Sequence, residues 1–311
     1  MWFLFTLCTI LAWSGSDLFS KMGSRPDDKN SHLKMLMAVG LVMGLHAIWQ
    51  VTAGGVVYDL HNFIAYLPIS AMYILSMMFG YIGLRYIELS ISSPICNSSG
   101  ALVAVLCFAV LGDRMSPMAL VAVVLISLGI FLLAVIEKKE GDEARQLRND
   151  PNAIKYERGL LAILFPVLYL IIDAMGTFLD SMFLDFALPD RFYVGVTEDT
   201  IELVCNISYE FTFMIVGIRA AIWVLGVKKE KLAVSRDGTK LLAAVFETVG
   251  QFTYVFALSG NAIVAAPAIG SYTVFSVIWS HLFLKERLTG KQYFVVAMVL
   301  VGVVILAFLD I

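Results

Sequence analysis

Long apolar runs constrain this chain more than any other feature of its sequence. Several of them reach about 20 residues, the length at which an α-helix crosses the roughly 30 Å hydrocarbon core of a bilayer. Hydrophobic residues make up 59% of the 311-residue chain and charged residues only 15%, whereas soluble domains average about 25% charged. Lipid offers the backbone no hydrogen-bond partners, so these runs must be helical. The sequence therefore predicts an all-α polytopic membrane protein.

Ten transmembrane helices are predicted, with spans at residues 2–22, 33–52, 65–87, 90–111, 115–136, 158–182, 204–227, 240–259, 262–284 and 288–309. The first run lacks a basic leading segment and a small-residue cleavage site, so it is expected to remain as the first helix. The highly charged stretch 137–157 is expected to be a cytoplasmic linker between two halves, residues 1–136 and 158–311. The other long connection, 185–203, favours a surface loop or a short interfacial helix.

The second half of the chain repeats the spacing of the proline, acid–arginine and glycine residues of the first half. An ungapped alignment that sets Pro94 against Pro267 also pairs Tyr81 with Tyr254, Ser98 with Ser271, Asp113-Arg114 with Glu286-Arg287, and Gly129 with Gly302. Each half then holds five helices, and an odd number makes the second half enter the membrane from the opposite side. Inverted repeats of this kind are typical of secondary transporters.

The repeated prolines mark positions where a helix is expected to start or bend. Proline lacks an amide hydrogen and constrains the preceding turn. Small residues near Pro94 and Pro267 would let neighbouring helices approach closely. The acid–arginine pairs are expected to end each span at the water interface, although Glu286 and Arg287 could instead form a buried pair.

The doubled pattern is carried by SSPICNSSGALVAVLCFAVLGDRMSPMALVAVVLISLGIFLLA at 92–134 and AAPAIGSYTVFSVIWSHLFLKERLTGKQYFVVAMVLVGVVILA at 265–307. It resembles the EamA-type, ten-helix members of the drug/metabolite transporter superfamily, over essentially the whole chain. The resemblance implies a central cavity between the halves, peripheral fifth and tenth helices, and alternating access by rocking of the halves. It carries no information about the substrate, and the polar connection 185–203 is longer than the family pattern.

Lysine and arginine residues are distributed unevenly between the two sides. Of the 22, 18 follow the first, third, fifth, seventh or ninth predicted span, and only Arg114 and Arg191 lie on the other side. The positive-inside rule then places the long basic loops in the cytoplasm and both termini outside. The resemblance implies the opposite orientation. The charge bias is large and spread over several loops, so it favours termini outside.

Ionisable side chains inside a span cost about 2.5–3.5 kcal/mol each on insertion scales and are therefore candidate functional residues. The candidates are Asp17, Lys21, Asp173, Asp180, Glu210, Arg219 and Glu247. Trp13 and Tyr169 precede two of these acids by four residues, so ring and carboxyl share a helix face in each half. Such a pair attracts a cation through its charge and its ring. A buried carboxyl can also exchange a proton, because desolvation favours its neutral form.

Structural alternatives are open at several of these acids. Asp17 could form an ion pair with Lys21 one helical turn away, and Asp173 could serve packing. Asp180 lies near the end of its predicted span and is expected at the membrane interface.

The remaining isolated polar groups are expected to find partners on other helices. Glu210 and Arg219 are too far apart on one helix for a direct pair, so each needs a partner elsewhere. His46 and His281 stand alone on apolar helices and are expected to pack in the core or at the interface.

One predicted span carries a polar stripe. Glu247, Gln251 and Tyr254 recur at helical spacing, so they face a cavity or partner helices rather than lipid. They could line a substrate site or form a structural hydrogen-bond network. In the alignment of the two halves, Tyr81 corresponds to Tyr254 of this stripe. The predicted substrate-binding residues are Trp13, Asp17, Tyr81, Asn97, Tyr169, Asp173, Glu210, Glu247, Gln251, Tyr254 and Tyr272.

No metal site, cofactor or nucleic-acid partner is predicted. The four cysteines, at positions 8, 96, 107 and 205, lack metal-ligand spacing and are expected to be buried thiols. A Walker A sequence is absent, as is a basic run interleaved with aromatic residues.

The sequence therefore favours a secondary carrier in the plasma membrane for a small polar metabolite, cationic or zwitterionic, with proton coupling. Its partners would be that small molecule and the lipid bilayer, and the sequence permits a homodimer. An intramembrane enzyme is the alternative, but the G-x-G-D sequence of intramembrane aspartyl proteases is absent. A non-transporting scaffold would not need two related halves.

The charge bias predicts the orientation of the chain. A reporter fused after Ile311 is expected to behave as extracytoplasmic, and one inserted in 141–150 as cytoplasmic, because the basic loops stay inside. Reporter activity on the two sides measures this, and the reversed pattern contradicts it.

Overall fold

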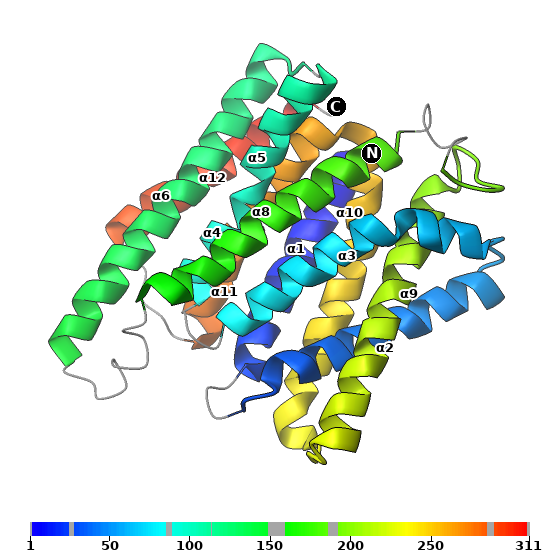
Figure 1. Ribbon diagram of the computed structural model, residues 1–311. Helices are drawn as coiled ribbons and strands as arrows, with labels where there is room; N and C mark the ends of the chain where they lie inside the picture. The colour runs from blue at the N-terminus through cyan, green and yellow to red at the C-terminus, as the bar shows by residue number, and fades with distance from the viewer. Residues whose placement is uncertain are drawn as a thin grey trace.

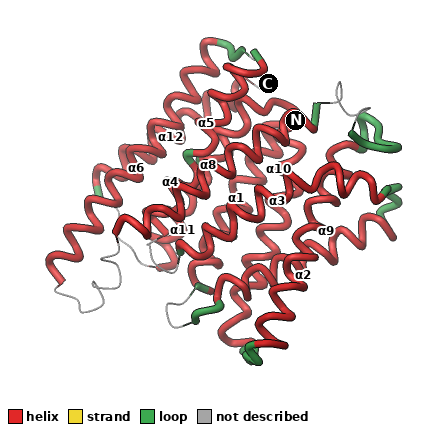
Figure 2. Tube along the Cα trace, viewed as in Figure 1, coloured by secondary structure: helices red, strands yellow, loops and turns green. Residues whose placement is uncertain are grey.

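The computed structural model describes residues 2–24, 28–84, 89–112, 114–148, 159–185, 192–284 and 289–309. Within these ranges every regular element is a helix (Figure 2). Both chain ends lie at the same end of the helical bundle (Figure 1). In chain order the elements are α1 (Trp2–Gly23), α2 (Ser31–Thr52), α3 (Leu60–Gly83), α4 (Leu89–Asn97), α5 (Ser99–Leu106), η1 (Cys107–Leu111), α6 (Pro117–Arg148), α8 (Gly159–Phe183), α9 (Ile201–Ala221), η3 (Ile222–Val227), α10 (Val234–Gly270), α11 (Tyr272–Leu284) and α12 (Gly290–Leu309).

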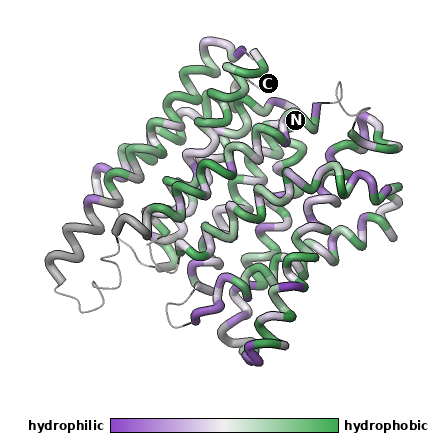
Figure 3. The backbone as a smooth tube through the Cα atoms, viewed as in Figure 1, coloured by the Kyte–Doolittle hydropathy of each residue, from purple (hydrophilic) through white to green (hydrophobic). Residues whose placement is uncertain are grey.

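Six helical stretches of the described ranges are long and apolar enough to cross a bilayer. They are Trp2–Gly23, Ser31–Thr52, Leu60–Gly83, Leu164–Phe183, Ile201–Val227 and Asp237–Phe283. Three shorter apolar helices accompany them, at Ile95–Leu111, Pro117–Leu132 and Gly290–Leu306. Figure 3 shows apolar residues dominating the helices.

Many large apolar side chains are exposed on the surface, and many polar side chains are buried beside the apolar core. Leu45, Phe108 and Phe294 are each at least 60% exposed, as expected of side chains that face lipid. Ser70 and Asn206, in contrast, are fully buried. Polar groups in a membrane protein gather inside because lipid cannot satisfy them.

Two helices are interrupted four residues after the repeated prolines. Ser98 separates α4 from α5, and Ser271 separates α10 from α11. At both places the serine amide donates to the carbonyl three residues earlier, with N–O distances of 3.2 Å at Ser98 and 3.0 Å at Ser271. A further break lies inside α10 at Asn261, whose backbone is non-helical (φ −168°, ψ 76°). This break falls between the predicted spans 240–259 and 262–284.

Some helix boundaries differ from those predicted. α6 continues to Arg148, through much of the stretch 137–157 expected to be a linker. Alanine, glutamate, lysine and arginine dominate this extension and are good helix formers. The start of α3 lies five residues before the predicted start at 65, and that of α10 six residues before 240. In 185–203, the described part before α9 consists of turns and irregular backbone.

Several sequence predictions fall outside the described residues. These are the linker segment 149–157, the segment 186–191, the acid–arginine pairs except Arg114, and the cations Arg25, Arg85, Lys155, Arg158, Arg191 and Lys285.

Glycines allow three close helix crossings. A Cβ on Gly40 of α2 would lie 2.6 Å from the Phe213 carbonyl oxygen of α9, and one on Gly100 of α5 would lie 2.5 Å from the Ala266 oxygen of α10. One on Gly302 of α12 would lie 2.7 Å from Ile126 of α6. Real Cβ atoms do not approach so closely, so the backbones meet only because a side chain is missing.

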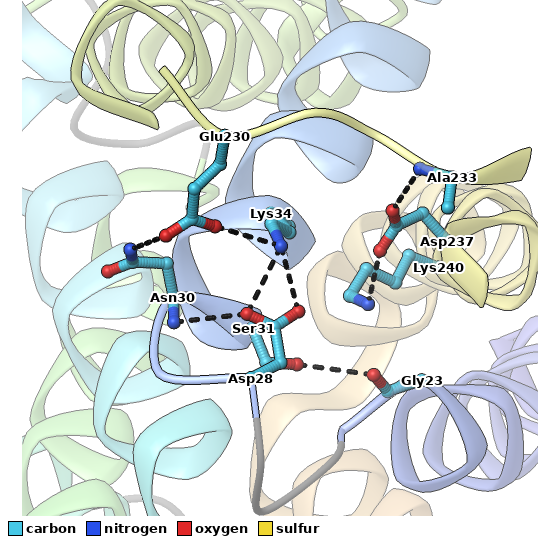
Figure 4. Close-up of polar contacts among 9 residues, drawn as sticks. All are labelled: Gly23, Asp28, Asn30, Ser31, Lys34, Glu230, Ala233, Asp237 and Lys240. Atoms are coloured by element: carbon cyan, nitrogen blue, oxygen red, sulfur yellow. Dashed lines mark hydrogen bonds and ion pairs between the residues drawn. The ribbon is translucent and has the colours of Figure 1, made fainter. Parts of the chain in front are cut away.

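An ion cluster joins two connections at the end of the bundle opposite the termini (Figure 4). The buried Lys34 ammonium lies 3.0 Å from both the Asp28 and the Glu230 carboxylates. Asn30 also donates to Glu230. The hydrogen bond from Lys34 lowers the pKa of Glu230 below its usual range. The cluster ties the α1–α2 loop and the start of α2 to the chain between η3 and α10. In the first turns of α10, Asp237 accepts from Lys240 at 2.8 Å.

The glycine crossings predict a sharp steric effect. Gly40→Leu is expected to destabilise the protein by about 1–3 kcal/mol or more, because the side chain must separate α2 from α9. Gly226→Ala is the control, since a Cβ there would meet nothing within 4 Å. Thermal unfolding of the purified protein measures both, and equal melting temperatures would contradict the tight crossing.

Candidate functional site

A cavity of about 100 Å³ lies among α1, α3, α4, α5, α8, α9, α10 and α11. That volume holds several water molecules. Its wall contains ten of the eleven residues predicted to bind substrate, brought from six of these elements: Trp13, Asp17, Tyr81, Asn97, Tyr169, Asp173, Glu247, Gln251, Tyr254 and Tyr272. Helices far apart in the chain thus converge on one space, and the role of these residues in binding stays a prediction.

Two of the cavity acids are held by serine hydroxyls from other helices. Asp17 accepts from Ser93 at 2.7 Å and from Ser276 at 2.9 Å. Asp173 accepts from Ser99 at 2.8 Å and from Ser76 at 3.4 Å. Each of these two acids therefore accepts hydrogen bonds from two different helices.

Glu247 completes a set of three carboxyls on the cavity wall. Ser16 of α1 donates to it at 2.8 Å. Among the described residues that line the cavity there is no lysine or arginine. The described hydrogen-bond donors to these three carboxyls are therefore neutral serine hydroxyls.

Aromatic rings form much of the remaining wall. Trp13 packs against Tyr254 with ring centroids 5.0 Å apart and against Tyr272 at 5.8 Å. Tyr73 meets Tyr254 edge to face at 6.1 Å and Tyr209 at 5.8 Å. Ring faces beside carboxylates are a recurrent means of holding organic cations.

Asn97 connects the two interrupted helices. Its side-chain amide donates to Ser93 at 3.0 Å and to Thr273 of α11. Ser93 is also the donor to Asp17. The amide thereby joins the break at the end of α4 to an acid of α1 through a single serine.

Asp180, predicted to lie at the membrane interface, is close to the end of α8, which ends at Phe183, and its side chain points into the protein. Asp180 is fully buried and accepts from Tyr66 at 2.6 Å and from Tyr73 at 3.1 Å. The Tyr73 hydroxyl also lies 2.7 Å from that of Tyr254, which donates to Thr177 at 3.0 Å. Neighbouring phenols from another helix let this acid be buried close to the end of its own helix.

Glu210 is the predicted residue that lies outside the cavity. Its buried carboxylate meets His46 Nδ1 of α2 at 2.7 Å, so this acid has found a partner on another helix, as expected. Gln50 lies 3.3 Å from the other imidazole nitrogen. Arg219 was also expected to find a partner on another helix, but its side chain is exposed and forms no ion pair with a described residue.

One pattern in the sequence does indicate that Asp180 faces the protein interior. Asp173, Thr177 and Asp180 recur at the same helical spacing as Glu247, Gln251 and Tyr254, so they form a second polar stripe. The lining serines gave no such indication in the sequence, because isolated serines are common in membrane helices. They are Ser16, Ser20, Ser92, Ser93 and Ser99.

Comparisons with known proteins give the family and the fold of this chain. The chain matches the EamA-like transporter family over residues 1–135 and 201–308. No curated protein matches it. A solved structure titled only "Crystal structure of protein" is 11% identical, covers 99% of this chain and 98% of its own, and superposes with a TM-score of 0.67. At that identity the likeness shows the fold alone.

The family match covers most of the chain, and the described part contains several apolar helices of membrane-spanning length. This polytopic membrane protein belongs to the EamA-like transporter family of the drug/metabolite transporter superfamily.

Proposed function

We propose that this protein is a secondary carrier that moves a small cationic or zwitterionic metabolite across the plasma membrane. The observation that carries the proposal is the cavity with three carboxyls, Asp17, Asp173 and Glu247, and no described lysine or arginine on its wall. Burying three acids is costly unless a positive charge offsets them. A transported cation, or a proton when the cavity is empty, would supply that charge.

We infer that the chain forms two inverted five-helix halves, and contacts at the interrupted helices support this. Ser93 Oγ lies 3.2 Å from Thr273 Oγ1, and Gly100 approaches Ala266. In the alignment that pairs Pro94 with Pro267, Ser93 corresponds to Ala266 and Gly100 corresponds to Thr273. The two contacts are therefore equivalent, as a two-fold axis between the halves requires.

The crossing of α6 with α12 supports the same axis. Gly302 meets Ile126, Gly129 meets Val299, and the same alignment relates these two contacts. In both crossings residue numbers rise along one helix and fall along its partner. Equivalent helices that run antiparallel are related by an axis perpendicular to them, which for spanning helices lies in the membrane plane.

Alternating access needs a seal on one side of the cavity, and the Asp180 network suits that role. Tyr66 and Tyr73 belong to the first proposed half, and Asp180 and Tyr254 belong to the second. By the chain order of the helices, this network lies toward the termini. The cavity continues the other way, past Ser20, Leu84 and Leu89. With the termini outside, the carrier is sealed toward the exterior.

The acids give the direct test of this function. Organic cations are expected to raise the melting temperature of the purified protein, whereas their uncharged isosteres should not. Asp173→Asn and Glu247→Gln should each weaken binding of such a cation about 10- to 100-fold, the loss expected for a hydrogen-bonded charge. Glu230→Gln is the control, because this acid lies outside the cavity.

Transport in proteoliposomes then separates substrate binding from proton coupling. If these acids carry the proton, uptake of the stabilising cation by either cavity variant should lose its pH dependence. Unchanged affinity and unchanged pH dependence in both variants would make the acids structural and contradict the proposal.

A further inference from the structure

Three polar side-chain atoms on the cavity wall have no hydrogen-bond partner among the described residues. They are the Trp13 indole nitrogen on α1, the Tyr81 hydroxyl on α3 and the Gln251 side-chain nitrogen on α10. All three are hydrogen-bond donors, and Tyr81 and Gln251 are only 7% and 2% exposed. A buried donor without an acceptor is strongly unfavourable, so such groups mark a place that a ligand or water completes.

Several other polar groups on the wall are satisfied. Tyr73 and Tyr254 bond to each other and to Thr177, and the Asn97 amide is shared between Ser93 and Thr273. Of the three unpartnered donors, the Trp13 indole packs against the rings of Tyr254 and Tyr272. Gln251 lies one helical turn after Glu247, and Tyr81 lines the same cavity as Glu247 and Asp17.

The charge around these donors limits which acceptor can reach them. A carboxylate on the substrate would enter a space that already holds three carboxyls, with no described cationic side chain to receive it. Like charges in a low-dielectric site repel strongly. A neutral oxygen, such as an amide or ester carbonyl, satisfies the same donors without that repulsion.

We propose that the cavity selects a small organic ammonium compound that also carries a neutral carbonyl oxygen. The ammonium group lies among Asp17, Asp173 and Glu247, and the carbonyl accepts from Tyr81 Oη and Gln251 Nε2. This inference rests on the proposed carrier function and narrows its substrate class. It makes Tyr81 and Gln251 the residues that distinguish this class from simple amines and from zwitterions.

Matched compounds test the inference on the purified full-length protein. L-Alaninamide and L-leucinamide carry an ammonium and a neutral carbonyl, L-alanine and L-leucine carry a carboxylate instead, and ethylamine and isoamylamine lack the acceptor. Thermal-shift titrations are expected to rank amide above amine by about three- to tenfold in affinity, the worth of one or two neutral hydrogen bonds. The amino acids should bind weakest.

Variants assign the preference to the two donors. Tyr81→Phe and Gln251→Leu are each expected to lower affinity for the amide about three- to tenfold and for the amine by less than about twofold. Tyr81→Phe should leave the melting temperature unchanged or raise it, because it removes a hydroxyl that has no partner. Tyr58→Phe is the matched control outside the cavity, where the phenol bonds Ser208 at 2.7 Å, and it should not alter the ranking.

The outcomes separate this inference from the proposed function. Equal affinity for amide and amine overturns the inference, since water then satisfies the donors, and leaves a cation carrier intact. Tightest binding of the amino acids also overturns it, in favour of a zwitterion. Equal losses for amide and amine in both variants, with lower melting temperatures, assign the donors to packing. If no compound shifts the melting temperature, the inference fails together with the cationic substrate proposed above.

Discussion

The close crossing of the two interrupted helices positions most of the candidate site. Gly100 and Gly270 lack side chains where the backbones meet, with a Cβ on Gly270 only 2.7 Å from the Asn97 carbonyl oxygen. This contact holds α4 and α5 against α10. The same broken helix then presents Ser93 to Asp17 and Ser99 to Asp173. Two acids on two other helices are thus oriented by hydroxyls that flank a single break, so separation of this crossing would disturb both at once.

The interactions that stabilise helix packing in a membrane differ from those in the core of a soluble protein. Apolar burial gives little drive toward association between helices in lipid, so close packing and buried hydrogen bonds must hold them together. Asp180 illustrates the second contribution. It is fully buried, and two phenols from α3 satisfy its oxygens. The arrangement is stable only while all its members are in place, because a buried carboxylate that lost its phenol partners would be left without hydrogen bonds. A contact of this kind suits a seal that forms as a unit and opens as a unit.

Much of the fold could be read from the sequence because lipid imposes simple rules. Length and hydropathy indicated the helices, and proline positions indicated where two of them would break, although the breaks lie at Ser98 and Ser271, four residues further on. Boundaries were less predictable. α6 runs to Arg148 because charged residues that leave the membrane can still continue a helix, so the end of an apolar run is not the end of the helix.

For the candidate site, the sequence by itself determined which residues are chemically unusual. An acid in an apolar span is conspicuous. Asp17 and Asp173 each follow an aromatic residue by four positions, and Glu247 begins a polar stripe, so all three could be singled out. Only the tertiary structure decided which of these groups meet. Glu210 looked equivalent to them, but its helix crosses α2 at Gly40 and turns the carboxylate to His46 instead of the cavity. Helical periodicity fixes the face on which a side chain lies, but what that face meets depends on helix crossings between segments far apart in the chain, and no local pattern encodes these.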